Sequence, residues 1–147
     1  MARTSTYLNF PRQTEEAFNF YKTVFGGEFC GGGVAHFGDF PPPEGMPQLA
    51  DSDKNLIFHI ELPIIGGHLL MGSDAPETRG FSINAGNNIL INLEPDTSDE
   101  TRRLYNALSA GGKVTMELQE MFWGALYGVC IDKYGIQWMF NCPEKLQ

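Results

Sequence analysis

Apolar residues with helical spacing first occur between a break at Pro11 and a glycine pair, Gly26 and Gly27. They recur every three to four positions, which is typical of a helix with one buried face. We expect Thr14 to be its N-cap, because a threonine hydroxyl can accept a free amide hydrogen of the first turn. Glycine commonly ends a helix, and residues 5–10 before the break are typical of a strand. The apolar positions of this helix are Ala17, Phe18, Tyr21, Val24 and Phe25.

The same order of features recurs in the second half of the chain. Residues 88–93 are typical of a strand, Pro95 breaks it, and Ser98 is the expected N-cap of a second helix. Gly111 and Gly112 end that helix as the first glycine pair ends the other. Such internal repetition indicates two copies of one structural unit. The apolar face of the second helix consists of Leu104, Tyr105 and Leu108.

Each half continues with an extended stretch and two strands, so each has the order β-α-β-β-β. The sequence therefore predicts an α+β fold in a single domain, 1–147. Module 1 spans about 4–74 and module 2 about 86–143. Residues 38–55 and 73–87 form long loops, which are either binding loops or plain connectors. The expected strands are 28–37, 56–62 and 67–71 in the first half, and 113–118, 125–131 and 136–141 in the second.

Charge and cysteine content exclude several classes of protein. The net charge is −8 and the ten Lys and Arg are scattered, whereas nucleic-acid binding needs clustered cations. No apolar run approaches the roughly 20 residues of a membrane span, and no secretory signal is visible at the start. The three cysteines lack CxxC spacing, which fits a reducing compartment. We expect a cytoplasmic protein that binds neither nucleic acid nor membrane.

Four segments resemble the PhnB-like branch of the glyoxalase/bleomycin-resistance/dioxygenase superfamily, the vicinal oxygen chelate proteins. They are EEAFNFYKTVFGGE, HIELPIIGGHLLMGSD, LYNALSAGGKVTMEL and WGALYGVCIDKYGIQWMFN, and the resemblance extends over nearly the whole chain. It implies two βαβββ modules that form a curved, partly closed mixed sheet around a cleft, with the helices outside. It also implies a homodimer, and many members bind a divalent metal in the cleft.

The residues at the metal-binding positions of this family differ from those of its metal-binding members. The family's ligands come from the first and last strand of each half, and strand parity places the first-strand positions on Ser5 and Asn88. In the metal-binding members, a glutamate ligand follows an Asp-Pro-x-Gly turn by four residues. At that spacing this sequence has Met71 and Met139. Serine, asparagine and thioether groups do not form a site for a hard cation. We therefore expect no metal and no cofactor, and a divalent metal is a disfavoured alternative.

Strand parity also predicts which side chains face the cleft. Leu8 and Phe10 should pack on the first helix, which leaves Tyr7 and Asn9 on the opposite face. In the same way, Ile89, Ile91 and Leu93 should pack on the second helix, which leaves Asn88 and Asn92 in the cleft. Further expected ligand-binding residues are Met71, Trp123, Tyr127, Gln137 and Met139, whereas Trp138 and Phe140 are assigned to the core.

His59 and Glu61 are the candidate catalytic residues. If Phe58, Ile60 and Leu62 fill the core, His59 and Glu61 point together to the opposite face of their strand. They could then act as an acid–base pair in the cleft. A hydrogen-bonded polar edge and a pair of metal ligands are the alternatives.

Three functions follow from this pattern. The first is a small-molecule binding protein with a degenerate metal site. The second is a lyase, isomerase or dioxygenase-type enzyme that acts on a small organic substrate in the same cleft. The third is a dimeric interaction module, whose cleft would be filled by its own side chains.

Overall fold

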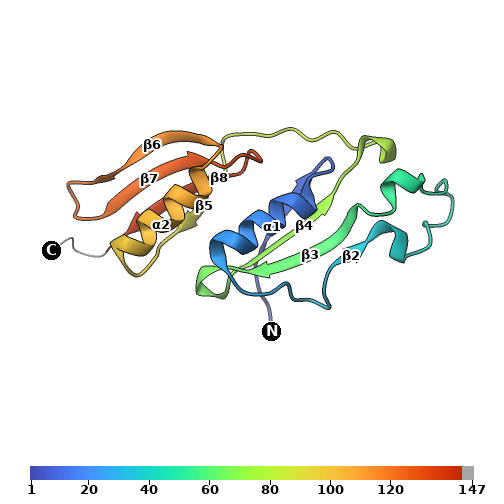
Figure 1. Cartoon of the computed structure of the whole chain (residues 1–147), viewed down its shortest axis with the longest axis horizontal. Coiled ribbons are helices and arrows are strands. Elements are labelled where there is room, and N and C mark those ends of the chain that lie inside the picture. The colour runs from blue at the N-terminus through green and yellow to red at the C-terminus, as the bar shows by residue number, and fades with distance from the viewer. Residues whose placement is uncertain (144–147) are drawn as a thin grey trace. The chain divides into compact units, whose positions relative to one another are not determined.

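The computed structural model describes residues 1–143 and divides into two compact units (Figure 1). Unit 1 is Met1–Ile83 and unit 2 begins at Asn84. Each contains one helix and a four-stranded mixed sheet, in the order β-α-β-β-β. The α+β class and the repeated module predicted from the sequence are confirmed. Neither four-stranded sheet is closed into a barrel.

Unit 1 has the strand order β1-β4-β3-β2, in which β1 and β4 are parallel and the other pairs antiparallel. Short 3₁₀ turns interrupt its loops at Phe37–Asp39, Asp51–Asp53, Ile65–Gly67 and Glu77–Arg79. Its regular elements are β1 (Thr6–Phe10), α1 (Thr14–Phe25), β2 (Ala35–His36), β3 (Ile57–Pro63) and β4 (Leu69–Asp74).

Unit 2 repeats this arrangement with the strand order β5-β8-β7-β6, in which β5 and β8 are parallel. The remaining neighbours are antiparallel. Its elements are β5 (Ile91–Leu93), α2 (Ser98–Ser109), β6 (Lys113–Glu120), β7 (Leu126–Ile131) and β8 (Gln137–Cys142).

Each helix covers one face of the sheet in its own unit (Figure 1). In unit 1 the buried layer includes Leu8 and Phe10 from β1, as their parity predicts, together with Phe18 from α1. The helix lies so close to β4 that a Cβ at Gly72 would come within 2.9 Å of the Phe18 ring. In unit 2 the corresponding layer is built on Leu104, Tyr105, Leu108, Trp138 and Phe140.

The helix caps differ from the sequence prediction. Thr14 is the first residue of α1, and its hydroxyl is buried without a hydrogen-bond partner in the described part of the chain. The Thr14 amide instead donates to Oδ1 of Asp74, 60 residues further along. In α2 the cap is Thr97, whose hydroxyl accepts from the Glu100 amide at 3.1 Å, and Ser98 is the first helical residue.

Two of the expected strands are much shorter than predicted. Ile91 pairs with Trp138 and β8 begins at Gln137, so the residues before Ile91 have almost no strand to pair with. Ile89 accordingly lies outside β5 and is 79% exposed, so its predicted packing on the helix is wrong. Of residues 28–37 only Ala35–His36 form a strand.

A β-bulge explains why Phe58 is not in the core. Ala35 pairs with His59 and its neighbour His36 with Ile57, so Phe58 is an extra residue in β3. A bulge shifts the alternation of side chains along a strand. Ile57 is therefore buried, whereas Phe58 is 46% exposed on the side opposite the core.

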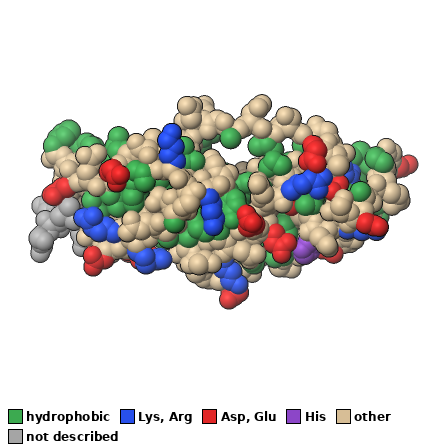
Figure 2. Space-filling model, turned by 45° about the horizontal axis from the view of Figure 1, so that its top comes forward, with side chains coloured by type: hydrophobic (Ala, Val, Ile, Leu, Met, Phe, Trp, Pro, Cys, Tyr) green, Lys and Arg blue, Asp and Glu red, His purple; other side chains and the backbone are tan. Residues whose placement is uncertain are grey.

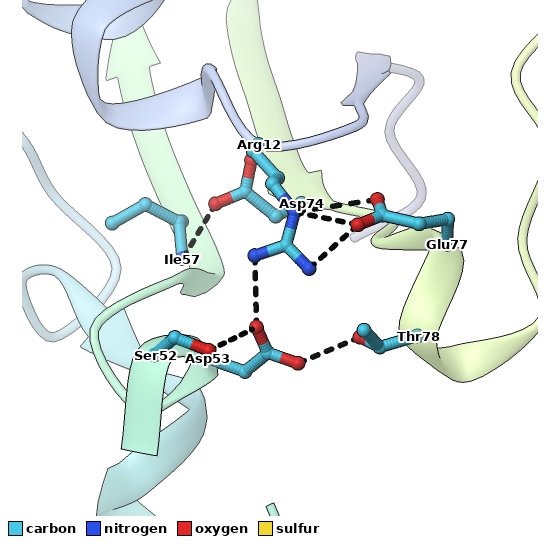
Figure 3. A network of polar contacts seen from close by, with 7 residues as sticks. All are labelled: Arg12, Ser52, Asp53, Ile57, Asp74, Glu77 and Thr78. Carbon is cyan, nitrogen blue, oxygen red and sulfur yellow. Dashed lines mark hydrogen bonds and ion pairs between the residues drawn. The ribbon is translucent and has the colours of Figure 1, made fainter. Parts of the chain in front are cut away.

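Asp53 and its neighbours fix the loops at one end of the unit 1 sheet (Figure 3). Arg12 donates to Oδ1 of Asp53 at 2.8 Å and pairs with Glu77, and Thr78 donates to the second oxygen of Asp53. Behind this network, Asp74 accepts from the backbone amides of Thr14 and Ile57. Three distant segments are thereby held beside the end of β4.

Charged side chains of both signs are scattered over the face seen in Figure 2 and do not form a cationic patch there. Neither helix, in the part of the chain described, is long and apolar enough to span a membrane. Cys130 and Cys142 are buried in unit 2 and Cys30 is half-buried in unit 1; all three are free thiols.

Candidate functional site

The candidate site in unit 1 is on the face of the sheet that α1 leaves uncovered. Residues of β1, β4 and β3 alternate between the helix-covered face and this one. Cross-strand pairing aligns Tyr7 with Met71 and Met71 with Glu61, and it aligns Asn9 with Ser73. Residues far apart in the sequence are thus brought into adjacent rows.

A cavity of about 430 Å³ lies over this face. Aromatic rings and aliphatic side chains contribute most of its walls, and polar side chains lie among them. Its volume falls within the range of small-molecule sites, which are mostly apolar with a few polar groups. The rings belong to Tyr7, Phe37, Phe58 and Phe81, and the polar groups to Asn9, His59, Ser73 and Asp74.

The rings form a corner beside the β3 bulge. The Phe37 and Phe58 rings are perpendicular, with centroids 5.6 Å apart. The Phe40 ring also packs on Phe58, with centroids 4.8 Å apart. Because the bulge turns Phe58 toward this side, a flat apolar group in the cavity would contact ring surfaces from two directions.

Neutral hydrogen-bonding groups also line the cavity. The Ser73 hydroxyl donates to Oδ1 of Asn9 at 3.1 Å, which fixes the orientation of the Asn9 amide. Asp74 also borders the cavity, but both of its oxygens accept backbone amides, as described above. Its carboxylate therefore stabilises the fold by accepting these backbone hydrogen bonds.

His59 and Glu61 point together to this face, as the sequence predicts, and are hydrogen-bonded to each other. Nε2 of His59 lies 2.9 Å from Oε1 of Glu61. The Glu61 side chain is only 12% exposed. The hydrogen bond from His59 lowers the pKa of Glu61, and burial opposes this effect. Glu61 is consequently held as a carboxylate.

The pair is extended at both ends. The Tyr7 hydroxyl lies 3.3 Å from Nδ1 of His59, and the two rings lie 5.7 Å apart. At the other end, the Cys30 thiol donates to Oε2 of Glu61 at 3.6 Å. Burial, followed by Glu61, raises the pKa of Cys30, so this cysteine is held as a thiol. Tyr7, His59, Glu61 and Cys30 therefore form one continuous chain of polar contacts.

Gly31 makes the position of the carboxylate possible. Its φ is +68°, in the left-handed region that favours glycine, and a Cβ there would lie 2.5 Å from the Glu61 carboxyl carbon. The backbone is anchored beside it, because the Cys30 amide donates to the Glu61 carbonyl. The glycine run 31–33 forms a turn, and Gly31 in it lies against Glu61.

The family positions for metal ligands do not suit a hard cation. In unit 1 the Ser5 hydroxyl points at the sulfur of Met71, 3.6 Å away. Met71 is buried, so a thioether occupies the space in which a metal-binding member has a carboxylate. No group of three or more His, Cys, Asp or Glu among residues 1–143 is arranged to hold a metal ion. The donor set therefore does not fit the family's metal.

In unit 2 the predicted residues Asn92, Tyr127 and Met139 share one face of the sheet. Asn92 pairs with Met139 across β5 and β8, and the Tyr127 hydroxyl donates to the Met139 sulfur at 3.2 Å. The Trp123 ring lies 6.1 Å from that of Tyr127. Thioethers at both family positions therefore receive a hydroxyl hydrogen bond.

Two predicted residues of unit 2 lie apart from this cluster. Asn88 precedes β5, and the residue that pairs with Met139 is Asn92. Asn88 therefore lies outside the paired residues of β5. Gln137, at the start of β8, donates to the carbonyl of Gly86 at 2.8 Å and so holds the segment that leads to β5.

Sequence reasoning missed several residues of the unit 1 cavity. Phe37 and Phe81 lie in loops, where no periodicity assigns a side chain to a face. Phe58 was assigned to the core because the bulge beneath it leaves no signal in the pattern. Gly31 could have been found, since three successive glycines beside a strand indicate close approach of another group.

Comparisons with known proteins agree with the fold and the repeat. A sequence profile of the Glyoxalase/Bleomycin resistance protein/Dioxygenase superfamily matches residues 7–140. Protein PA1353 from Pseudomonas aeruginosa is 33% identical, with a TM-score of 0.76 over 97% of this chain and 98% of that one. Protein YjdN from Escherichia coli K12 is 27% identical over 146 residues, 96% of this chain and 95% of its own.

The PhnB protein from Bacillus cereus has the same fold, with a TM-score of 0.72 at 21% identity over 96% of this chain and 99% of that one. This agrees with the PhnB-like motifs of the sequence. The chain belongs to the Glyoxalase/Bleomycin resistance protein/Dioxygenase superfamily.

Proposed function

We propose that this protein binds a small, largely uncharged organic molecule in the unit 1 cavity, without a metal ion. The observation that carries the proposal is the cavity of about 430 Å³, whose walls are aromatic rings with a few fixed polar groups. A surface of this kind excludes water from a ligand and still orients it by hydrogen bonds. Tyr7, Asn9 and His59, expected from the sequence to contact a ligand or substrate, all border it.

The walls favour a ligand that has a flat apolar part and a neutral hydrogen-bonding group. Phe37 and Phe58 offer two perpendicular ring surfaces for the flat part. Asn9 and Ser73 offer amide and hydroxyl groups for the polar part. Among residues 1–143, no Lys or Arg borders the cavity, so an anionic ligand would find no permanently charged cation there.

Independence from metal is supported by the two thioethers. Met71 and Met139 receive hydroxyl hydrogen bonds from Ser5 and Tyr127, and both sulfurs are poor ligands for hard cations. Elemental analysis of the purified protein tests this part directly. One divalent ion per chain that survives purification would overturn it.

The binding test uses saturation-transfer NMR with benzamide and phenol, each of which joins an aromatic ring to a neutral polar group. We expect both to receive saturation from chelator-treated protein. Phe58→Ala should weaken the binding of both probes about tenfold, which corresponds to the roughly 1.4 kcal/mol scale of one aromatic contact. Asn19→Ala, on the exposed face of α1, is the control and should bind normally.

Loss of binding in Asn19→Ala, or equal binding in wild type and Phe58→Ala, would contradict this assignment of the cavity. Binding that appears only after a divalent metal is added would contradict the metal-independent part. The cavity argues against the third hypothesis, a dimeric interaction module whose cleft is filled by its own side chains.

The proposal includes a cytoplasmic location and a homodimer. The three free cysteines support the reducing compartment. Homodimers are common among proteins of this kind, and light scattering on purified protein measures the state directly. A monomer at micromolar concentration would remove the dimer from the proposal and leave the unit 1 cavity unaffected.

A further inference from the structure

We propose that Glu61, His59 and Tyr7 form a proton relay, and that the unit 1 cavity catalyses proton transfer at a weakly acidic O–H or C–H group of its ligand. This inference rests on the proposed function, because the same cavity must admit the substrate. Tyr7 is the catalytic residue that touches the substrate, His59 exchanges protons with Tyr7, and Glu61 positions His59.

The hydrogen bonds fix the direction of the relay. A carboxylate can only accept hydrogen bonds, so the proton between Glu61 and His59 belongs to Nε2 of His59. In the neutral imidazole, Nδ1 is then an acceptor, and the Tyr7 hydroxyl, 3.3 Å away, is its donor. The Tyr7 proton thus points at His59, and the lone pairs of its oxygen remain for another partner.

The lone pairs of the Tyr7 oxygen can accept a proton from a ligand in the cavity. Its side chain borders the cavity and is 47% exposed, whereas Glu61 at the far end of the relay is nearly buried. The relay therefore has one end in the protein and one end open to a ligand. Asn9 and Ser73 lie beside Tyr7 on the same face and could orient the ligand's polar group.

The proton-transfer step balances without any other reactant. A substrate X–H bond breaks as its proton passes to the Tyr7 oxygen, and the Tyr7 proton passes to Nδ1 of His59. The X–H electron pair stays on the substrate as an anion, and the imidazolium faces the Glu61 carboxylate. Return of a proton to a different substrate atom yields an isomer, so nothing is oxidised or reduced.

The surroundings of His59 are consistent with a proton that moves. The titratable groups that face it are Tyr7 on β1 and Glu61 on its own strand, and Asp74 borders the same cavity. Cys30 contacts Glu61 and not His59, and Arg3 acts on both Cys30 and Glu61 through its charge. Positive charge on His59 is thus stabilised chiefly by Glu61.

The test measures deuterium uptake from D₂O into 2-indanone and hydroxyacetone by proton NMR. Both are neutral carbon acids, and 2-indanone also has an aromatic ring for the Phe37–Phe58 corner. We expect the wild-type protein to accelerate uptake into at least one of them. Tyr7→Phe and His59→Gln should lose about 100-fold of that acceleration, the usual contribution of a general acid–base group. Tyr134→Phe, in the turn before β8, is the matched control and should retain it.

Glu61→Gln separates a positioning role from a structural one. Removal of the negative charge should destabilise the imidazolium, so the pH midpoint of the exchange rate should move to lower pH. A residue with only a structural role would change the rate at every pH without moving the midpoint. An unchanged midpoint would overturn the role of Glu61 in the relay.

The two proposals fail in distinguishable ways. Saturation transfer to 2-indanone without faster deuterium uptake, or with equal uptake in Tyr7→Phe, would overturn the relay and leave binding intact. Absence of binding for these probes, benzamide and phenol would overturn both. Tyr7→Phe removes one oxygen from a half-exposed side chain, so it should fold even if His59→Gln does not.

Discussion

A Cβ atom at position 31 would lie 2.5 Å from the carboxyl carbon and from Oε2 of Glu61, so Gly31 provides the space that this carboxylate occupies. Gly31→Ala should therefore push Glu61 away from His59 without removing any member of the relay. We expect the pKa of Glu61 to rise, because its carboxylate loses the hydrogen bond from His59 that lowers it. NMR titration of the Glu61 side chain measures this shift.

Gly32→Ala is the matched control for that variant. Gly32 also has a positive φ, of +90°, but a Cβ there would have no atom within 4 Å. Both variants should lose about 1 kcal/mol of unfolding free energy from the strained backbone. Only Gly31→Ala should change the titration of Glu61, and an equal change in both would contradict the packing explanation.

Substitution of Asp74 should lower the unfolding free energy. Its two oxygens accept the backbone amides of Thr14 and Ile57, which belong to the start of α1 and the start of β3. Asp74→Ala leaves both amides without their acceptor in a buried site, and we expect a loss of about 3 kcal/mol. Chemical unfolding measures it.

Asp74→Asn should show an intermediate loss, because one amide oxygen can still accept one of the two backbone hydrogens. Asp99→Asn, on the exposed first turn of α2, is the surface control and should change stability little. If Asp74→Ala were as stable as Asp99→Asn, the carboxylate would not be what holds the two segments together.

The fold was largely predictable because the signals that specify it are local and occur twice. The helical face of residues 17–25, the glycine pairs and the strand alternation at Leu8 and Phe10 each depend on near neighbours. Their repetition in unit 2 gave independent support for the same order of elements. The predicted cap at Thr14 was wrong because the contact that holds this helix end depends on a distant residue. No residue near Thr14 in the sequence indicates the carboxylate of Asp74.

The candidate site was predictable only where strand parity holds. Parity placed Tyr7, Asn9 and Met71 on one face, and the observed pairing places them there. Parity failed at Phe58, because the extra residue at the bulge has no local signal. It failed again before Ile91, since the end of a strand is set by the length of its partner.

The network around Arg12 predicts how stability depends on pH (Figure 3). Hydrogen bonds from Thr78 and then Arg12 lower the pKa of Asp53. A carboxyl group whose folded pKa is lowered stabilises the fold above its unfolded pKa, near 3.9, and this contribution is lost as pH falls through the folded pKa. The unfolding free energy should therefore drop below about pH 4.

Asp53→Asn should make that drop smaller, because the substituted residue no longer titrates. Glu77 shares Arg12, and its pKa is also lowered, but it is 65% exposed, against 4% for Asp53, so Glu77→Gln should change the pH dependence less. Unfolding in urea at pH 7 and pH 3 provides the comparison. A steeper acid loss in Asp53→Asn than in wild type would contradict the assignment.

Thr14 predicts a substitution that stabilises the protein. Its hydroxyl is fully buried, and no hydrogen-bond partner for Oγ1 is present among residues 1–143. A buried polar group without a partner costs about 1 kcal/mol or more, and valine has nearly the same shape. Thr14→Val should therefore raise the unfolding free energy by about 1 kcal/mol.

Thr101 in α2 is the matched control for this change. It is equally buried, but its hydroxyl donates to the Thr97 carbonyl at 2.8 Å. Thr101→Val loses that hydrogen bond, so we expect it to lower the unfolding free energy by about 1 kcal/mol. Opposite signs for the two variants in chemical unfolding would show that the unsatisfied hydroxyl, and not the threonine-to-valine change as such, determines the effect at Thr14. A loss of stability in Thr14→Val as large as that in Thr101→Val would mean that the Thr14 hydroxyl has a partner.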